Sequence, residues 1–220
     1  MKQSIFHLFD LDGTVIDSFH RVKPCLKEGG DLDLAKYRRE ACSHEKVMKD
    51  ELLPLVEHMR ALIASGEQVG ICTARHMSKS DYVFLRQHGV RTPFIASRDR
   101  IHKFFPAEMV RAICNSGDAA YKAAWLQMLK ATRPESTIHL YDDHLGVLEA
   151  AKALGVVTFN ATVLNEQLDK AYALGLAEGA AQAEQEAWEQ EESLTDAEMF
   201  DGVFPDDHEA LTFGAIMQSE

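Results

Sequence analysis

Near the N-terminus, a short apolar run ends at two aspartates and a glycine: residues 4–15 read SIFHLFDLDGTV. An apolar run of this length, bounded by a turn signal, predicts a buried strand. Asp10 and Asp12 follow the run two positions apart, so on an extended backbone their side chains point to the same side. Gly13 permits a sharp turn directly after them. The stretch therefore predicts a strand that ends in a pair of carboxylates.

Further apolar runs alternate with helical patterns over the first 160 residues. Strands are expected at 68–72, 93–96, 137–141 and 156–159, and helices at 51–64, 78–88, 118–131 and 145–154. This alternation predicts an α/β fold, a doubly wound three-layer sandwich around a parallel sheet. We place this domain at residues 1–160, with residues 18–49 as a small flap or lid. Ligands in such sheets bind beyond the carboxyl ends of the strands.

Polar residues follow several of these strand ends. They are Asp10 and Asp12 after the first strand, Thr73 and Arg75 after the second with Ala74 between them, and Asp142 and Asp143 after the fourth, with Lys122 near the start of the preceding helix. Four gathered carboxylates repel one another unless a cation lies among them, and Mg²⁺ prefers oxygen ligands. A carboxylate can attack phosphorus, a second can act as general acid and base, and a threonine and a lysine can hold a phosphoryl group.

The Asp-x-Asp-Gly pattern alone also occurs in turns and in calcium-binding loops. An EF-hand loop needs Glu at its twelfth position, and counting from Asp10 that position is Arg21. The calcium-loop interpretation therefore fails. Asp118, four residues before Lys122, could hold that lysine or cap its helix.

The ordered set of residues resembles the haloacid dehalogenase (HAD) superfamily of phosphohydrolases. Residues 9–15 match its first motif, Thr73 the second, Lys122 the third and Asp142-Asp143 the fourth. The resemblance implies that Asp10 is the nucleophile and Asp12 the general acid and base. It implies Mg²⁺ at Asp10, Asp12, Asp142 and Asp143, where Asp12 offers its backbone carbonyl. It implies phosphate binding at Thr73, Ala74, Arg75 and Lys122.

The gaps between the motifs leave no room for a large cap, and an open site suits a large substrate. The spacing is also similar to the phosphatase half of phage-type polynucleotide kinase-phosphatases, which removes 3′-phosphates from nucleic-acid ends. The basic stretch 75–111 fits phosphate backbones or a solvated face equally well. His76, His144 and residues 98–103 could contact substrate. We expect a Mg²⁺-dependent phosphomonoesterase acting on nucleic-acid 3′-ends or nucleotides. The alternatives are another small phosphoester, phosphotransfer, or a non-catalytic binding module.

The net charge of −12 over 220 residues is unevenly spread: residues 161–220 hold one of the 23 Lys and Arg but 15 of the 35 Asp and Glu. We expect a helix to about residue 190, then an acidic tail that is disordered or docks a basic protein partner. The four cysteines form no CxxC pair, and neither a signal peptide nor an apolar run of membrane-spanning length is expected. A cytoplasmic protein is therefore expected, with its oligomeric state left open.

Overall fold

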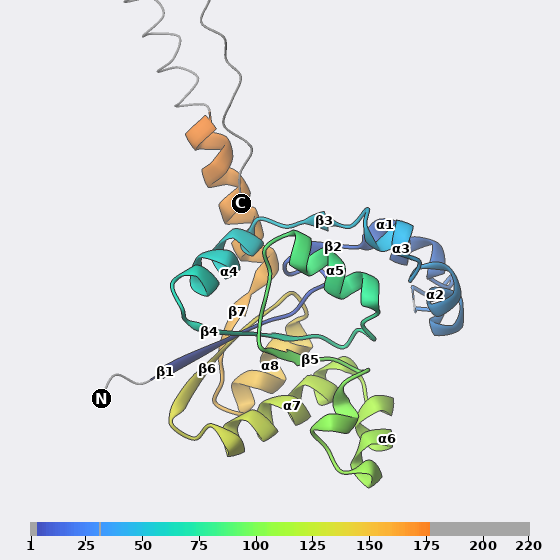
Figure 1. Cartoon of the computed structure of the whole chain (residues 1–220), viewed down its shortest axis with the longest axis vertical. Helices are drawn as coiled ribbons and strands as arrows, with labels where there is room; N and C mark the ends of the chain where they lie inside the picture. Colours follow the sequence, from blue (N-terminus) through green and yellow to red (C-terminus); the bar gives the residue numbers. More distant parts are fainter. Residues whose placement is uncertain (1–3, 31, 177–220) are drawn as a thin grey trace, which may run out of the picture. The chain divides into compact units, whose positions relative to one another are not determined.

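The structure is a computed structural model that describes residues 4–30 and 32–176. Its main sheet consists of β1 (Ser4–Phe9), β4 (Gln68–Cys72), β5 (Phe94–Ala96), β6 (Ser136–Asp142) and β7 (Val157–Asn160). The strands lie in the order β5-β4-β1-β6-β7, and every neighbouring pair is parallel. The predicted parallel sheet is therefore confirmed, with β1 at its centre (Figure 1).

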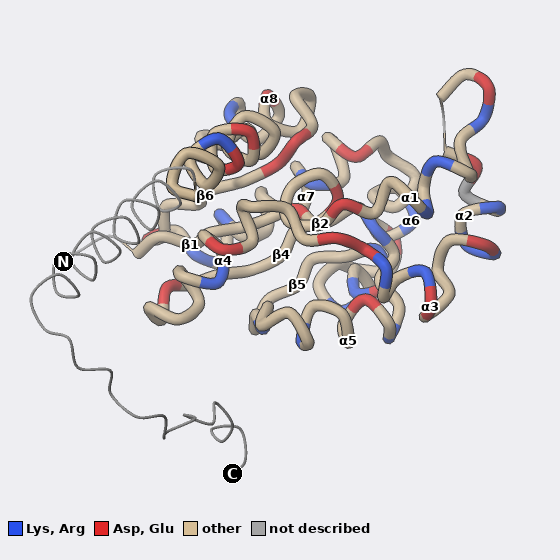
Figure 2. Tube along the Cα trace, turned by 90° about the horizontal axis from the view of Figure 1, so that it is seen from above, with Lys and Arg blue, Asp and Glu red and all other residues tan. Residues whose placement is uncertain are grey.

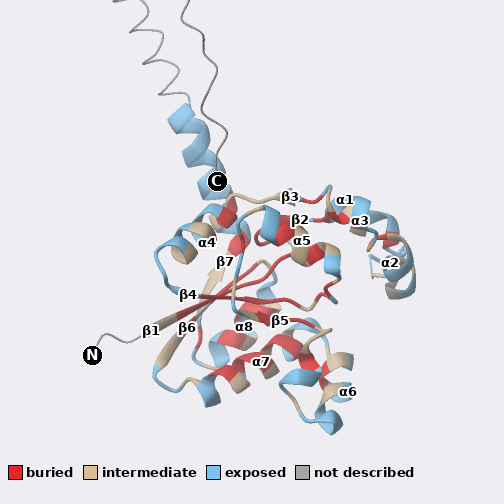
Figure 3. Ribbon diagram, viewed as in Figure 1, coloured by how far each residue is buried: buried red, intermediate tan, exposed pale blue. Residues whose placement is uncertain are grey.

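Helices cover both faces of this sheet, and each face has its own apolar core. On one face, α4 (Leu55–Ala64) and α5 (Lys79–Gln87) pack over residues that include Phe9 and Ile71. On the other, α7 (Asp118–Thr132) and α8 (Leu145–Ala153) pack over Phe6 and Leu8. Buried residues accordingly run along the strands and the inner sides of the helices (Figure 3). The three-layer α/β sandwich is confirmed.

The segment between β1 and α4 differs in detail from the prediction. A helix was expected from residue 51, but Glu51–Leu52 is strand β3, which pairs antiparallel with β2 (Ile16–Asp17), and α4 begins only after Pro54. The pairing keeps these residues extended, which overrides their helical spacing. The short helices α1 (Phe19–Val22), η1 (Lys23–Cys25), α2 (Leu34–Glu40) and α3 (His44–Val47) fill the region expected to form a small flap or lid.

The region before α7 holds two elements that the sequence did not predict, η2 (Ile101–Lys103) and α6 (Ala107–Asn115). The apolar residues of α6 follow helical spacing (Met109, Val110, Ile113 and Cys114), so the sequence carried a signal for this helix that the prediction did not use. In the fold Ile113 is buried and Met109 is about half exposed. Helix α6 begins directly after Pro106, a residue well suited to the start of a helix.

The chain divides into two compact units, Met1–Tyr172 and Ala173–Glu220. The first unit continues past residue 160, where we placed the domain boundary: residues 161–172 are helical, and Ala161 and Asn165 are buried. In the second unit, residues 173–176 are helical and exposed, and the predicted acidic tail otherwise lies outside the described residues. Within the described part of the chain, no helix is both long and apolar enough to cross a membrane.

Candidate active site

Strand register brings three of the predicted carboxylates together. Phe9 of β1 pairs with Tyr141 of β6, so the next residues, Asp10 and Asp142, lie side by side at the carboxyl ends of the two strands. The backbone N–H of Asp10 donates to the carbonyl of Tyr141 at 2.9 Å. One carboxylate oxygen from each of Asp10, Asp142 and Asp143 lies within 4.8 Å of the others. The predicted juxtaposition at this edge of the sheet is therefore present.

Lys122 bridges two of these carboxylates from α7. Its Nζ lies 2.8 Å from Oδ2 of Asp10 and 2.6 Å from Oδ2 of Asp142, and the side chain is almost fully buried. Burial alone lowers the pKa of a lysine, but the two carboxylates raise the pKa of Lys122 above its ordinary value. The lysine is therefore a fixed positive charge. Asp118 does not hold it, because that carboxylate pairs with Arg98 at 3.1 Å.

Asp10 lies in surroundings that disfavour its ionised form. Burial raises its pKa to about 6, the charge of Lys122 opposes that rise, and the negative charge of Asp142 adds to it. Oδ1 of Asp10 is buried and has no hydrogen-bond partner among the described residues. The pKa of Asp143 is also raised, first by burial and then by the charge of Asp10. Crowded oxygens with one unpartnered member match the donor set that Mg²⁺ takes, so these residues fit a divalent cation.

Position 13 requires a glycine, because its backbone lies directly against the Asp143 side chain. Its φ of +70° lies in the left-handed region. A Cβ at this position would lie 2.7 Å from Cγ of Asp143, closer than side-chain atoms approach one another. The turn after the first motif therefore packs its backbone directly against the carboxylate cluster.

Asp12 points to a different set of partners. It accepts hydrogen bonds from Nε of Arg75 at 2.9 Å, from Nη2 of Arg75 and from Oγ of Ser18. Burial raises the pKa of Asp12, but the charge and hydrogen bonds of Arg75 outweigh burial and hold the pKa below its ordinary value. Asp12 is therefore two positions from Asp10 in sequence, but its side chain is paired separately from the three clustered carboxylates.

The predicted phosphate-binding loop lies at the end of β4. Thr73 is buried, its N–H donates to the carbonyl of Ala96 at 2.9 Å, and its Oγ1 accepts from the N–H of Arg75 at 3.2 Å, so its hydroxyl hydrogen is free to donate. The carbonyl of Ala74 accepts from Nε of Arg98 at 2.6 Å. Phosphate binding by these residues and Lys122 stays a prediction.

The basic stretch does not form a single charged face. Arg98 is engaged by backbone carbonyls and stacks over the ring of Tyr121 at 4.5 Å. Lys and Arg are interspersed with Asp and Glu over the described trace (Figure 2). His76 and His144 are exposed, and Nδ1 of His144 accepts from the N–H of Val147 in the first turn of α8. Their contact with substrate stays a prediction.

Several buried polar residues at this edge were not predicted from the sequence. Arg21 donates to both carboxylate oxygens of Asp50, each at 2.7 Å, and Arg75 donates to Asp81 at 2.8 Å. Arg21 lies in the region interpreted as a flap and Asp50 directly follows that region, 29 positions later, so no local spacing signal joins them. Asn165 was assigned to the tail, yet it links the carbonyl of Thr14 to the first N–H of α4.

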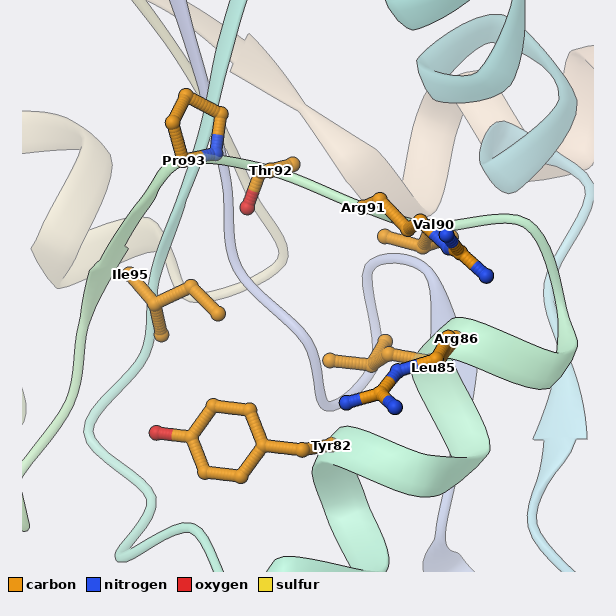
Figure 4. Close-up of a pocket in the computed structure, with 8 residues that line it drawn as sticks. All are labelled: Tyr82, Leu85, Arg86, Val90, Arg91, Thr92, Pro93 and Ile95. Atoms are coloured by element: carbon orange, nitrogen blue, oxygen red, sulfur yellow. The ribbon is translucent and has the colours of Figure 1, made fainter.

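Two pockets lie away from the carboxylates. One, of about 330 Å³, lies between α5 and β5, with Tyr82, Leu85 and Ile95 among its lining residues (Figure 4). The other, of about 610 Å³, has Phe6, Phe94 and Arg133 in its wall. None of the predicted site residues lines either pocket. The carboxylates are therefore not part of either pocket.

Comparison with known proteins gives a match over nearly the whole chain. The sequence model of a family described as bacteriophage T5 5′-deoxynucleotidase matches residues 1–209. A 5′-deoxynucleotidase of Escherichia phage T5 is 46% identical over 167 residues, which cover 73% of this chain and 68% of that protein.

Among solved structures, a hydrolase from Streptococcus pneumoniae TIGR4 has a TM-score of 0.45 at 13% identity, covering 76% of this chain and 99% of that chain. A HAD family enzyme from Bacteroides thetaiotaomicron, solved as a magnesium complex, has a TM-score of 0.41 at 11% identity, covering 72% of this chain and 93% of that chain.

Proposed function

The chain belongs to the bacteriophage T5 5′-deoxynucleotidase family, and from this premise we propose that it is a Mg²⁺-dependent phosphatase that hydrolyses deoxynucleotide 5′-phosphates. Membership confirms the expected phosphohydrolase and removes the need for a non-catalytic interpretation of the domain. The observation that carries the chemistry is the unpartnered, buried Oδ1 of Asp10, beside a charged lysine and two further carboxylates. An oxygen without a hydrogen-bond partner is available to attack phosphorus or to bind a cation.

We assign the steps to this chain's own residues. Asp10 attacks phosphorus, the bond to the leaving oxygen breaks, and Asp12 donates a proton to that oxygen. Arg75 holds the pKa of Asp12 low in the free protein, so in this scheme Asp12 takes up that proton from solvent when the substrate binds. A water molecule then gives its proton to Asp12 and attacks the aspartyl-phosphate, which releases inorganic phosphate and restores Asp10. Lys122 and the Thr73 hydroxyl neutralise and hold the phosphoryl oxygens. Mg²⁺ held by Asp10, Asp142 and Asp143 would supply further neutralisation of phosphoryl charge.

An exposed aromatic ring supports a nucleotide as substrate. Phe19 is 55% exposed and directly follows Ser18, whose hydroxyl donates to Asp12. Nζ of Lys23 lies 5.9 Å from the centre of the Phe19 ring. An aromatic face beside a positive charge can stack on a base and attract its phosphate. The relative's substrate class and this ring point to the same kind of ligand.

A substrate panel tests the proposal. The full chain is incubated with Mg²⁺ and with deoxynucleoside 5′-monophosphates, 3′-phosphorylated oligonucleotides or 5′-phosphorylated oligonucleotides, and released phosphate is measured. We expect hydrolysis of the monophosphates, loss of it with a chelator and in Asp10→Asn, and retention in Glu149→Gln, which removes an exposed carboxylate on α8. Absence of 5′-monophosphate hydrolysis by the wild type would refute the proposal. Cleavage of 3′-phosphates alone would favour the polynucleotide alternative.

A further inference from the structure

Behind Asp12 lies a set of buried charges that the proposed reaction does not use. Two arginines and two aspartates form it, and we call it the arginine–aspartate network: Arg21, Asp50, Arg75 and Asp81. Their side chains are 1%, 0%, 3% and 5% exposed. Buried charges of this kind persist only where each has a partner, and truncating one partner is strongly destabilising.

Every nitrogen of the Arg75 guanidinium faces a carboxylate. Nε and Nη2 donate to the two oxygens of Asp12, while Nη1 donates to Oδ1 of Asp81 and lies 3.8 Å from Oδ2 of Asp50. A planar guanidinium that binds a carboxylate through two parallel N–H groups fixes the plane of that carboxylate. Asp12 is itself 41% exposed and has one other side-chain partner, Ser18, among the described residues. Arg75 is therefore the main restraint on its orientation.

Arg75 is in turn held by parts of the fold. Oδ2 of Asp81 accepts from the N–H of Ser78 at 2.7 Å and caps the start of α5, which leaves Oδ1 for Arg75. Asp50 is fixed by two hydrogen bonds from Arg21. Arg21 also donates to the hydroxyl of Tyr37 in α2 at 3.1 Å. The network thus connects Asp12 to α5 and to the small helices between β2 and β3.

We propose that Arg75 is a positioning residue that orients the Asp12 carboxylate, with Asp81 holding Arg75, and that Arg75 does not bind the phosphate as the sequence predicted. The role rests on the proposed phosphatase reaction, in which Asp12 exchanges a proton with the leaving oxygen and with water. A phosphate ligand needs donors directed at the substrate, and the donors of Arg75 are directed at protein carboxylates. A residue that acts through Asp12 affects the proton-transfer steps and leaves phosphate affinity unchanged.

The experiment compares Arg75→Gln, Arg75→Lys and Asp81→Asn in the full chain, with Arg60→Gln as the matched control. Arg60 donates to the carbonyl of His88 and to Glu57, and it has no hydrogen bond or ion pair with the carboxylates of the site or of the arginine–aspartate network. The turnover number and KM for a deoxynucleoside 5′-monophosphate, and the inhibition constant of inorganic phosphate, are measured for each. A further assay measures the burst of nitrophenol released from para-nitrophenyl phosphate, which reports formation of the aspartyl-phosphate. Nitrophenol leaves with little need for a proton, so this step depends little on Asp12.

We expect Arg75→Gln to lower kcat on the nucleotide about 10- to 100-fold, with KM and the phosphate inhibition constant within about twofold of wild type. General acid–base catalysis typically contributes about 100- to 10,000-fold, and the expected loss is smaller because Asp12 itself is still present. Arg75→Lys should lower kcat nearly as much, because an ammonium cannot bind the Asp12 carboxylate through two parallel N–H groups. The nitrophenol burst should be retained. In an Asp12→Asn background, Arg75→Gln should cost no more than about a further twofold.

A tenfold rise in KM and in the phosphate inhibition constant, with Arg75→Lys close to wild type, would show that Arg75 binds phosphate and would overturn the inference. The inference would also be overturned if Arg75→Gln lowered kcat in the Asp12→Asn background as much as it does in the wild-type background. If Arg75→Gln does not fold, the same comparison of kcat with KM and the phosphate inhibition constant is made with Arg75→Lys and Asp81→Asn. Crystal structures of wild type and Arg75→Lys give a readout that is independent of turnover. A displaced Asp12 carboxylate supports the inference even if the nucleotidase proposal fails, and an unmoved one refutes it.

Discussion

Replacing the proposed nucleophile should make the metal-free protein more stable. In Asp10→Asn, the isosteric amide keeps the shape of the side chain but removes a carboxylate that its surroundings disfavour. Asp10 is 7% exposed, shares Lys122 with Asp142 and has one oxygen without a hydrogen-bond partner among the described residues. Catalytic groups held in such environments are a known source of instability that function requires.

The magnitude follows from the pKa of Asp10, which burial raises from 3.8 to about 6. Each unit of pKa corresponds to about 1.4 kcal/mol, so the ionised carboxylate lowers the free energy of unfolding by about 3 kcal/mol. Because the folded pKa is the higher one, the folded state binds the proton more tightly. The penalty is therefore complete above pH 6, shrinks as pH falls from 6 toward 3.8, and is absent below both values. Asn at this position carries no such penalty at any pH.

Urea denaturation with a chelator present, at pH 7.5 and again at pH 4.5, measures the difference. We expect Asp10→Asn to be more stable than wild type by about 3 kcal/mol at pH 7.5, and by much less at pH 4.5. Glu149→Gln should show no change at either pH, since Glu149 is exposed on α8. A variant that is no more stable than wild type at pH 7.5, or a gain that persists undiminished at pH 4.5, would contradict the assignment of a raised pKa to Asp10.

Three further substitutions test the surroundings of the site. Asn165→Ala should lower the free energy of unfolding by about 2 kcal/mol in urea, because two buried backbone groups lose their partner, and an unchanged midpoint would show that water replaces the amide. Lys122→Met should lower the free energy of unfolding of the metal-free protein by about 3 kcal/mol, because it leaves two buried carboxylates uncompensated. Calorimetry with and without Mg²⁺ should show that the ion restores part of this loss. Equal losses in both conditions would argue against a site shared by the lysine and the ion. Gly13→Ala should lose about 1–3 kcal/mol through its positive φ and its clash with Asp143, so a thermal midpoint equal to wild type would mean that the turn relaxes freely.

The sheet and the strand-end carboxylates could be predicted because their signals are local. Each strand is a short apolar run, and parallel strands place their carboxyl ends at one edge, so order along the chain was enough to group Asp10, Lys122 and Asp142. The boundaries near β3 could not be predicted. Glu51 and Leu52 have helical spacing, and only their pairing with β2 makes them extended.

The arginine–aspartate network could not be predicted for a different reason. Arg75 contacts Asp12 across 63 positions, and Arg21 contacts Asp50 across 29. In sequence each arginine has the pattern of a surface residue or a phosphate ligand, because burial of a charge becomes visible only when its partner is placed. Asn165 was missed similarly, since an acidic composition around it suggested a solvated tail while its amide binds backbone groups of the first unit.

The distribution of buried charge indicates where a divalent cation belongs. Asp12, Asp50 and Asp81 share two cations, Arg21 and Arg75, so that group carries one surplus negative charge. Among the described residues, Lys122 is the one cation paired with Asp10 and Asp142, and Asp143 lies beside them without an ion pair, which leaves a surplus of two negative charges when all three are ionised. The pKa values of these three carboxyls are raised first by burial, and in each case a neighbouring carboxylate adds to the rise that Lys122 opposes. Mg²⁺ would balance the second group and would overcompensate the first, so the ion is expected at Asp10, Asp142 and Asp143, while the side chain of Asp12 remains with Arg75 for proton transfer.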